Sequence, residues 1–267
     1  MDARRIFPGF GIERLSSAIV IEIRNLQKSF NGKSVLHKID LDIPKSKTQI
    51  IIGRSGSGKS VLLKHIIGLI RPDAGEIFVE GEEICSLSDR DLYRVRKKFG
   101  MLFQSSALFD SMTVEDNISL GVREHRLFPK NEISRRVAEK LEMVGLPGIE
   151  KMRPAELSGG MKKRVGLARA LMMEPEFVLY DEPTTGLDPI MADAINDLII
   201  YCTDQLKVTS IVVTHDMVSA YKVGDRISML HEGEIIFSGS PKEVQSSNDP
   251  IVRQFIEGKA EGPLQVY

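Results

Sequence analysis

Short runs of consecutive apolar residues alternate along the chain with segments of helical periodicity. The apolar runs are rich in β-branched and aromatic side chains, which is typical of strands buried on both faces. These runs are 19–23, 49–52, 77–79, 101–103, 177–180, 210–213, 227–230 and 235–237. Apolar residues recur at helical spacing in 61–70, 114–120, 133–144, 165–173, 191–206 and 217–223. This alternation predicts an α/β protein with a mostly parallel central sheet.

One interval departs from the alternating pattern. Residues 105–157 contain helical segments but no convincing strand, and they are punctuated by Pro129, Pro147, Gly148 and Pro154. We therefore expect a helical lobe inserted between two strands of the sheet. The last two apolar runs flank Glu232-Gly233, a pair typical of a tight turn, and are expected to form a hairpin.

Composition narrows the class of protein. The 267 residues suffice for one large α/β domain or for one domain with an inserted lobe. Lys plus Arg number 36 and Asp plus Glu 37, so a general nucleic-acid binder, which needs a basic excess, is disfavoured. No apolar run approaches the ~18 residues of a membrane span, and residues 1–17 lack the apolar core of a secretory signal. We expect a soluble chain that stays in the cytoplasm.

A phosphate-binding loop follows the second apolar run. Residues 53–60 read GRSGSGKS, which matches GxxxxGK[ST] between a strand and a helix. Lys59 would reach the β and γ phosphates, and the Ser60 hydroxyl would ligate Mg²⁺. Backbone N–H groups can curl around phosphate oxygens at Gly53, Ser55, Gly56 and Gly58. A Gly/Ser-rich turn that matches the pattern by chance is the alternative.

Two carboxylates end the apolar run 177–180. Beside a phosphate loop, Asp181 at the carboxyl end of a buried strand can hold Mg²⁺ through water. Glu182 then points at the attacking water and serves as the general base. For an isolated pair, two acids capping a strand at a solvated edge would be the default reading.

Gln104 and His215 have the same placement as the two acids. Each follows a predicted strand, and the carboxyl ends of parallel strands form the edge at which open α/β sheets bind ligands. An amide can orient water or touch Mg²⁺, and an imidazole can hydrogen-bond a γ-phosphate. A lone histidine after a strand is usually structural, and it is the shared edge that favours function.

A second helix start is also suited to anions. Ser158 is a good N-cap, and Gly159 and Gly160 leave N–H donors exposed at the start of the following helix. An ordinary helix cap is the alternative, and spacing alone does not explain a second phosphate-binding helix terminus.

Together these motifs resemble those of the ATP-binding subunits of ABC transporters. The resemblance covers residues 19–245 and includes the phosphate loop, Gln104 of the Q-loop, the signature 157–161, the Asp181-Glu182 pair, the D-loop with Asp188, and the switch His215. It implies an ATP-hydrolysing P-loop NTPase with a mostly parallel core sheet, an antiparallel β subdomain and an inserted helical subdomain. It also implies a head-to-tail homodimer that binds Mg²⁺ and ATP at the interface. In such a dimer Ser158, Gly159 and Gly160 contact the γ-phosphate held by the other chain.

The resemblance assigns one aromatic residue and a set of boundaries. Phe30 matches the aromatic that stacks on adenine, and a buried core phenylalanine is the alternative. The expected parts are an N-terminal extension 1–18, an ATP-binding core 19–104 and 168–245, a helical signature subdomain 105–167, and a C-terminal tail 246–267.

Two features resemble the ATPases of Mce/Mla-type lipid transport systems: Met161 after the signature glycines, and the tail that follows Asp249. This implies phospholipid transport between the inner and outer membranes by a peripheral subunit on the cytoplasmic side of the inner membrane. The implied partners are an integral-membrane permease, an MCE-type substrate-binding protein and a small regulatory protein, with no nucleic acid. The segment 105–113 is the candidate for receiving a permease helix, with a core cluster of the lobe as the alternative. The alternative functions are the ATPase of a polar-solute importer, for example for amino acids, and more remotely a soluble regulatory ATPase.

Overall fold

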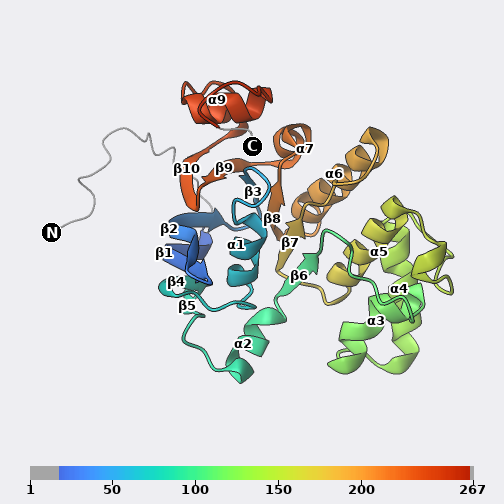
Figure 1. The fold of residues 1–267 in the computed structure, drawn as a ribbon. Helices are drawn as coiled ribbons and strands as arrows, with labels where there is room; N and C mark the ends of the chain where they lie inside the picture. Colours follow the sequence, from blue (N-terminus) through green and yellow to red (C-terminus); the bar gives the residue numbers. More distant parts are fainter. Residues whose placement is uncertain (1–17, 265–267) are drawn as a thin grey trace.

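A six-stranded sheet forms the centre of the computed structural model, which describes residues 18–264 (Figure 1). The expected extension 1–18 therefore lies outside the described residues, apart from Ala18. The strand order is β10-β9-β3-β8-β7-β6, and all neighbours are parallel except the β9–β10 hairpin. The strands are β3 (Thr48–Ile52), β6 (Phe99–Leu102), β7 (Phe177–Asp181), β8 (Thr209–Thr214), β9 (Arg226–His231) and β10 (Glu234–Gly239). The prediction of a mostly parallel central sheet is confirmed.

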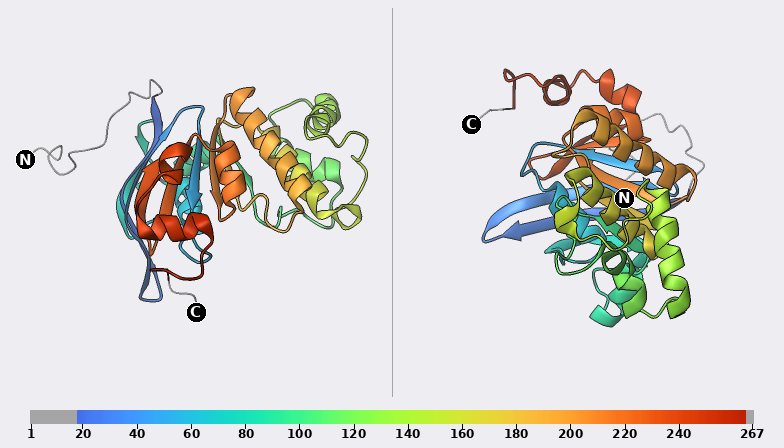
Figure 2. Two further views of the ribbon diagram at one scale, coloured as in Figure 1. Left: turned by 90° about the horizontal axis from the view of Figure 1, so that it is seen from above. Right: turned by 90° about the vertical axis from the view of Figure 1, so that its right-hand side faces the viewer.

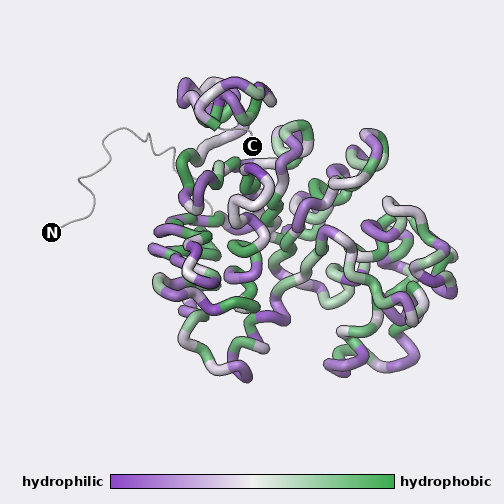
Figure 3. Tube along the Cα trace, viewed as in Figure 1, coloured by the Kyte–Doolittle hydropathy of each residue, from purple (hydrophilic) through white to green (hydrophobic). Residues whose placement is uncertain are grey.

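The central strands are buried on both faces. Every residue of β3, β7 and β8 is buried, as their unbroken apolar runs predict. Along β3, Ile50 and Ile52 join the apolar cluster on one face of the sheet, whereas Ile51 joins the cluster on the other face. In Figure 3 apolar residues accordingly run through the central strands, and polar residues mark many of the outer turns.

A second, antiparallel sheet lies beside the first. Its order is β2-β1-β4-β5, with β1 (Ile19–Phe30), β2 (Lys33–Pro44), β4 (Ala74–Val79) and β5 (Glu82–Glu83). β2 was not predicted, because the strands were predicted from runs of consecutive apolar residues. In β2, polar residues separate the buried apolar ones. Leu36, Ile39, Leu41 and Ile43 point inward and join the apolar cluster that also contains Ile51.

Nine α-helices occur among residues 18–264. They are α1 (Lys59–Ile66), α2 (Asp89–Arg96), α3 (Val114–Glu124), α4 (Lys130–Met143), α5 (Gly159–Met172), α6 (Pro189–Asp204), α7 (Met217–Val223), α8 (Pro241–Gln245) and α9 (Pro250–Glu257). In this part of the chain, no helix combines the length and the apolar character needed to cross a bilayer. The first helix begins two residues before the predicted 61–70 and ends at Ile66, because Gly68, just after the C-cap Ile67, adopts φ +65.

The helices α3, α4 and α5 form the expected inserted lobe. Between β6 and β7 the chain contains no strand, and the lobe lies to one side of the central sheet (Figure 1). Val122, Val137, Leu141 and Val165 are fully buried in its interior. The boundary expected between residues 167 and 168 falls inside α5, a helix that contacts both the lobe and β6.

The C-terminal segment folds back on its own chain. The Gln254 side chain on α9 donates to the carbonyls of Lys259 and Leu264, at 3.1 Å each, and accepts from the Leu264 N–H at 2.6 Å. Leu264 and Val252 are buried in the main apolar cluster. Figures 1 and 2 place α9 at one end of the molecule, opposite the end that carries α2 and α3.

Candidate active site

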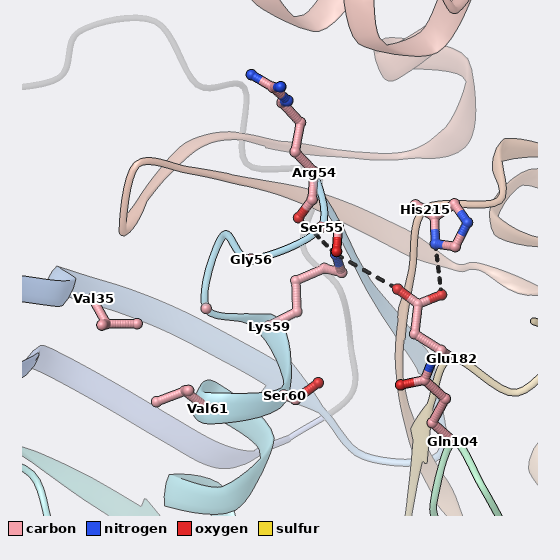
Figure 4. A pocket seen from close by; sticks show the side chains of 11 residues that line it. Val35, Arg54, Ser55, Gly56, Lys59, Ser60, Val61, Gln104, Glu182 and His215 are labelled. Atoms are coloured by element: carbon pink, nitrogen blue, oxygen red, sulfur yellow. Dashed lines mark hydrogen bonds and ion pairs between the residues drawn. The ribbon is translucent and has the colours of Figure 1, made fainter. Parts of the chain in front are cut away.

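The segments that follow the parallel strands β3, β6, β7 and β8 contribute to the lining of one cavity, whose side chains Figure 4 shows. The phosphate loop follows β3, and Gln104 lies just beyond β6. Asp181 ends β7, Glu182 comes directly after it, and His215 follows β8. The cavity has a volume of about 490 Å³ and is lined by Val35, Arg54, Ser55, Gly56, Gly58, Lys59, Ser60, Val61, Gln104, Glu182 and His215. The structure thus brings together side chains that the sequence placed at the ends of separate strands.

The phosphate loop is shaped by glycines with positive φ. A Cβ at Gly53 would lie 2.3 Å from the carbonyl oxygen of Leu230 on β9, so only glycine permits this approach. Gly58 has φ +103 and occupies the N-cap position of α1, whose N-terminus opens onto the cavity. Backbone N–H groups at a helix start attract anions, so this loop is suited to hold phosphate.

Lys59 points from α1 across the loop. Its Nζ donates to the carbonyls of Gly53 at 2.7 Å and Arg54 at 3.0 Å, and it lies 3.6 Å from Oε1 of Glu182. Burial lowers the pKa of the Lys59 ammonium, and the Glu182 and Asp181 carboxylates oppose that shift. The ammonium is therefore held in position at the floor of the cavity.

Ser60 and Asp181 form a hydrogen-bonded pair of oxygen groups beside the phosphate loop. The Ser60 hydroxyl donates to Oδ1 of Asp181 at 2.8 Å, and Gln104 lines the same cavity. Hydroxyl, carboxylate and amide oxygens are the ligands that Mg²⁺ prefers, and Mg²⁺ usually completes its shell with water and substrate phosphates. Among residues 18–264 no cluster of three His, Cys, Asp or Glu side chains forms a metal site. The oxygen donors of Ser60, Asp181 and Gln104 are of the kind that fits a Mg²⁺ ion bound together with a nucleotide.

Glu182 is held by contacts of both its backbone and its side chain. Its backbone has φ +49, in the left-handed region, and its N–H donates to the Val213 carbonyl at 3.0 Å. Its Oε2 lies 2.9 Å from Nδ1 of His215 and accepts from the Thr185 hydroxyl at 3.1 Å. Such sparsely populated backbone conformations persist only where neighbouring contacts hold them, and they cluster at functional sites.

The residues of the signature lie outside this cavity. Ser158 is exposed at the N-terminus of α5, where its hydroxyl accepts from the Met161 N–H at 3.3 Å. Gly160 lies against α6, the helix that follows the D-loop, since a Cβ at Gly160 would be 2.5 Å from the Met191 side chain. Asp188 caps that helix by accepting from two N–H groups at 3.0 Å. Within one chain, Ser158, Gly159, Gly160 and Asp188 therefore lie near one another, at a place separate from the cavity.

Phe30 also lies outside the cavity lining. It ends β1 with an exposed fraction of 40%, so the alternative of a buried core phenylalanine is wrong. Val35, on the strand that follows, lines the cavity instead. Val35 was not predicted as a site residue, because β2 lacks an unbroken apolar run and no local motif marks this position.

A phosphate loop at the edge of a parallel sheet, facing a strand that ends in Asp-Glu, defines a P-loop ATPase. The ABC transporter family matches residues 36–185, more than half of the chain. The chain belongs to the ABC transporter family.

Relatives and solved structures agree with this membership. The intermembrane phospholipid transport ATP-binding protein MlaF is 41% identical in Escherichia coli K12, over 93% of each chain, and 41% identical in Haemophilus influenzae. A protein of Mycobacterium leprae named as a probable ribonucleotide transport ATP-binding protein, mkl, is 42% identical over 95% of this chain and 73% of its own.

Two solved cassettes have the same fold. One is a dimeric ATP-binding cassette in a post-hydrolysis state with ADP and Pi, with a TM-score of 0.77 and 30% identity over 83% of this chain and 98% of the other. The second is cbiO1 of Clostridium perfringens, part of the complex cbiONQ, with a TM-score of 0.79 and 30% identity over 88% and 94%. Family and site together make this chain an ATP hydrolase, as the sequence predicts.

Proposed function

We propose that this chain is the ATP-hydrolysing subunit of a membrane transporter that moves phospholipid between the inner and outer membranes. The main support for this proposal is the 41% identity to MlaF over 93% of both chains. The catalytic geometry supports the hydrolytic half of the proposal, because the phosphate loop, Glu182 and His215 surround one cavity.

Six polar side chains at or beside the cavity have a role in hydrolysis. Mg²⁺ held by Ser60, Asp181 and Gln104 would, when bound, neutralise charge on the phosphates. Lys59 binds the β and γ phosphates. The Glu182 carboxylate accepts a proton as water attacks the γ-phosphorus, and the bond to the ADP oxygen breaks to release phosphate. His215, beside that carboxylate, donates a hydrogen bond to the γ-phosphate.

A second copy of the chain completes the site. Ser158 and the glycines after it are suited to bind an anion, yet they do not line the cavity of their own chain. Apolar side chains stand exposed near the D-loop and the switch, with Ile190 at 81% and Val218 at 75%. A head-to-tail dimer would bury them and would place Ser158 on the other copy's ATP, and the related ADP-bound cassette is dimeric. Phe30 would then stack on adenine at the outer side of the cavity.

The loop 105–113 is the proposed contact with an integral-membrane permease. Phe109 is half exposed there, while Leu108 packs against the core of the lobe. Asn117 on α3 holds the loop by accepting from the Phe109 N–H at 2.8 Å and donating to the Thr113 carbonyl at 3.0 Å. An exposed apolar side chain on a braced loop can receive a partner helix. In this proposal the subunit is peripheral, on the cytoplasmic side of the inner membrane, with an MCE-type protein and a small regulatory protein as further partners.

The mkl relatives favour a second candidate, an ATPase that energises transport of a polar solute, because the name of those relatives refers to ribonucleotides. Their identity is nearly the same as that of MlaF, but the alignment covers 73% of their length against 93% of MlaF. The full-length correspondence supports the phospholipid assignment.

The test is reconstitution of the complex that the full chain forms with its membrane subunits. The complex, purified in mild detergent, is inserted into liposomes and supplied with fluorescent phospholipid and a separate acceptor. We expect transfer of phospholipid that requires ATP and that is lost in a complex carrying Glu182→Gln. Hydrolysis that is stimulated by a ribonucleotide or an amino acid, with no phospholipid transfer, would contradict the proposal.

A further inference from the structure

The helix α5 joins the two functional surfaces of the chain. Its N-terminus carries Ser158 and the two signature glycines, and one turn further along a side chain reaches the segments that follow β6 and β7. The contact rests on Lys163, which is only 5% exposed. Its ammonium donates to the carbonyl of Gln104 at 2.5 Å and to the carbonyl of Glu182 at 3.2 Å. One buried cation therefore binds the peptides of two proposed catalytic residues at the same point.

The surrounding packing leaves little room for α5 to slide over these loops. A Cβ at Gly166 would lie 2.9 Å from Leu102, and a Cβ at Gly100 would lie 2.6 Å from the Ala170 carbonyl. Further along α5, Arg169 donates to the carbonyls of residues 106 and 107 at 2.7 Å each. The helix and the loop after β6 are thus in close contact, so a shift of α5 moves the loop with it.

We propose that Lys163 is a positioning residue for ATP hydrolysis, which transmits the engagement of Ser158 by a second copy's nucleotide to Glu182 and Gln104 of its own site. The inference rests on the proposed dimer, in which the N-terminus of α5 meets the other copy's ATP. Movement of α5 on that contact would then shift the peptides of Gln104 and Glu182, to which Lys163 donates.

The chemistry of lysine suits this position. An ammonium offers three donors and can bind carbonyls from two separate loops, whereas an apolar side chain would leave both carbonyls without this donor. Glu182 needs such support because its backbone lies at φ +49. Burial lowers the pKa of Lys163, and the Asp181 and Glu182 carboxylates favour the charged form and oppose this shift.

The test compares Lys163→Met with Lys163→Arg and with Lys162→Met, a matched control one residue away on the same helix. Initial rates of phosphate release by the full chain are measured against ATP concentration, with nucleotide affinity and thermal unfolding measured in parallel. We expect Lys163→Met to lose kcat by at least about tenfold, with KM and nucleotide affinity changed by less than about threefold. Arginine should restore most of the turnover, and Lys162→Met should match the wild type.

A second measurement separates positioning from general damage. In the background of Glu182→Gln, adding Lys163→Met should leave the ATP-dependent dimer intact by analytical sedimentation, because Lys163 acts on turnover and not on nucleotide capture. If Lys163→Met does not fold, Lys163→Gln takes its place with the same expectation. Wild-type kcat in the neutral variant overturns the role of Lys163, as does a loss of dimer and nucleotide affinity in proportion to kcat. Absence of hydrolysis in the wild-type chain would instead contradict the proposed function.

Discussion

Nδ1 of His215 lies 2.9 Å from Oε2 of Glu182, and the other oxygen of the same carboxylate lies 3.6 Å from the Lys59 ammonium. Lys59 and His215, the two residues proposed to bind phosphate, thus both contact the carboxylate of Glu182, the proposed base (Figure 4). In the proposed mechanism, the oxygens of a bound triphosphate would compete with the Glu182 carboxylate for these two partners.

The first prediction concerns the base. Glu182→Gln keeps the size and polarity of the side chain but removes its ability to accept a proton. We expect nucleotide binding to persist while turnover falls at least about a hundredfold, because general-base catalysis contributes ~10²–10⁴. An ATP-bound dimer should accumulate and be visible by sedimentation. A rate of ATP hydrolysis equal to that of the wild type would show that Glu182 is not the general base.

The second prediction concerns the shared site. Ser158→Arg places a bulky cation at the exposed start of α5, where the other copy's γ-phosphate would lie. We expect hydrolysis to be abolished, with nucleotide still bound by the monomer through Lys59. The matched control is Ser88→Arg, because Ser88 caps α2 in the same way by accepting from the Asp91 N–H at 3.2 Å. Loss of either cap costs about 1 kcal/mol of stability. Equal turnover in the two variants would count against an interfacial ATP.

The third prediction concerns the metal. Asp181→Asn removes the carboxylate that faces the Ser60 hydroxyl at 2.8 Å. Since Mg²⁺ binds charged oxygen ligands in preference to amides, the variant should need a higher Mg²⁺ concentration for half-maximal hydrolysis. Chelation by EDTA should stop hydrolysis in the wild type, and added Mg²⁺ should restore it. A variant with an unchanged Mg²⁺ requirement would show that Asp181 does not act on the metal.

The fourth prediction concerns the pH dependence of stability. Glu115 on α3 accepts from Lys151 at 2.7 Å and from Ser134 at 2.6 Å. These bonds hold the pKa of the Glu115 carboxyl below its usual value, against the opposing effect of burial. Because the folded state has the lower pKa, the stabilisation is present above the unfolded pKa of about 4.3 and is lost as the pH falls through the folded pKa.

Urea unfolding at pH 7 and at pH 3 tests this linkage. Wild type should be more stable than Glu115→Gln at pH 7, and the difference should be smaller at pH 3, which lies below the unfolded pKa. Glu124→Gln, at an exposed position of the same helix, is the control and should show a small difference at both pH values. A difference for Glu115→Gln that stays constant with pH would contradict the assignment of the ion pair.

Many of the proposed site residues could be predicted from the sequence, because their positions depend on residues that are close to them along the chain. The spacing of Gly53, Gly58 and Lys59 after an apolar run is sufficient to predict the phosphate loop, since a few residues determine the local backbone. The place of Asp181 and Glu182 could be predicted in the same way, because the carboxyl end of a buried parallel strand lies at the ligand-binding edge of its sheet. The order of strands and helices likewise predicts the fold class.

Other features were decided by the tertiary structure. The contact of Lys163 with Gln104 and Glu182, the place of Val35 in the cavity and the exposure of Phe30 carry no local signal. Each depends on the distance between segments that are remote in sequence. Periodicity and propensity describe only the residues within a turn or two of one another, whereas such distances emerge when the strands pair and the helices pack on them.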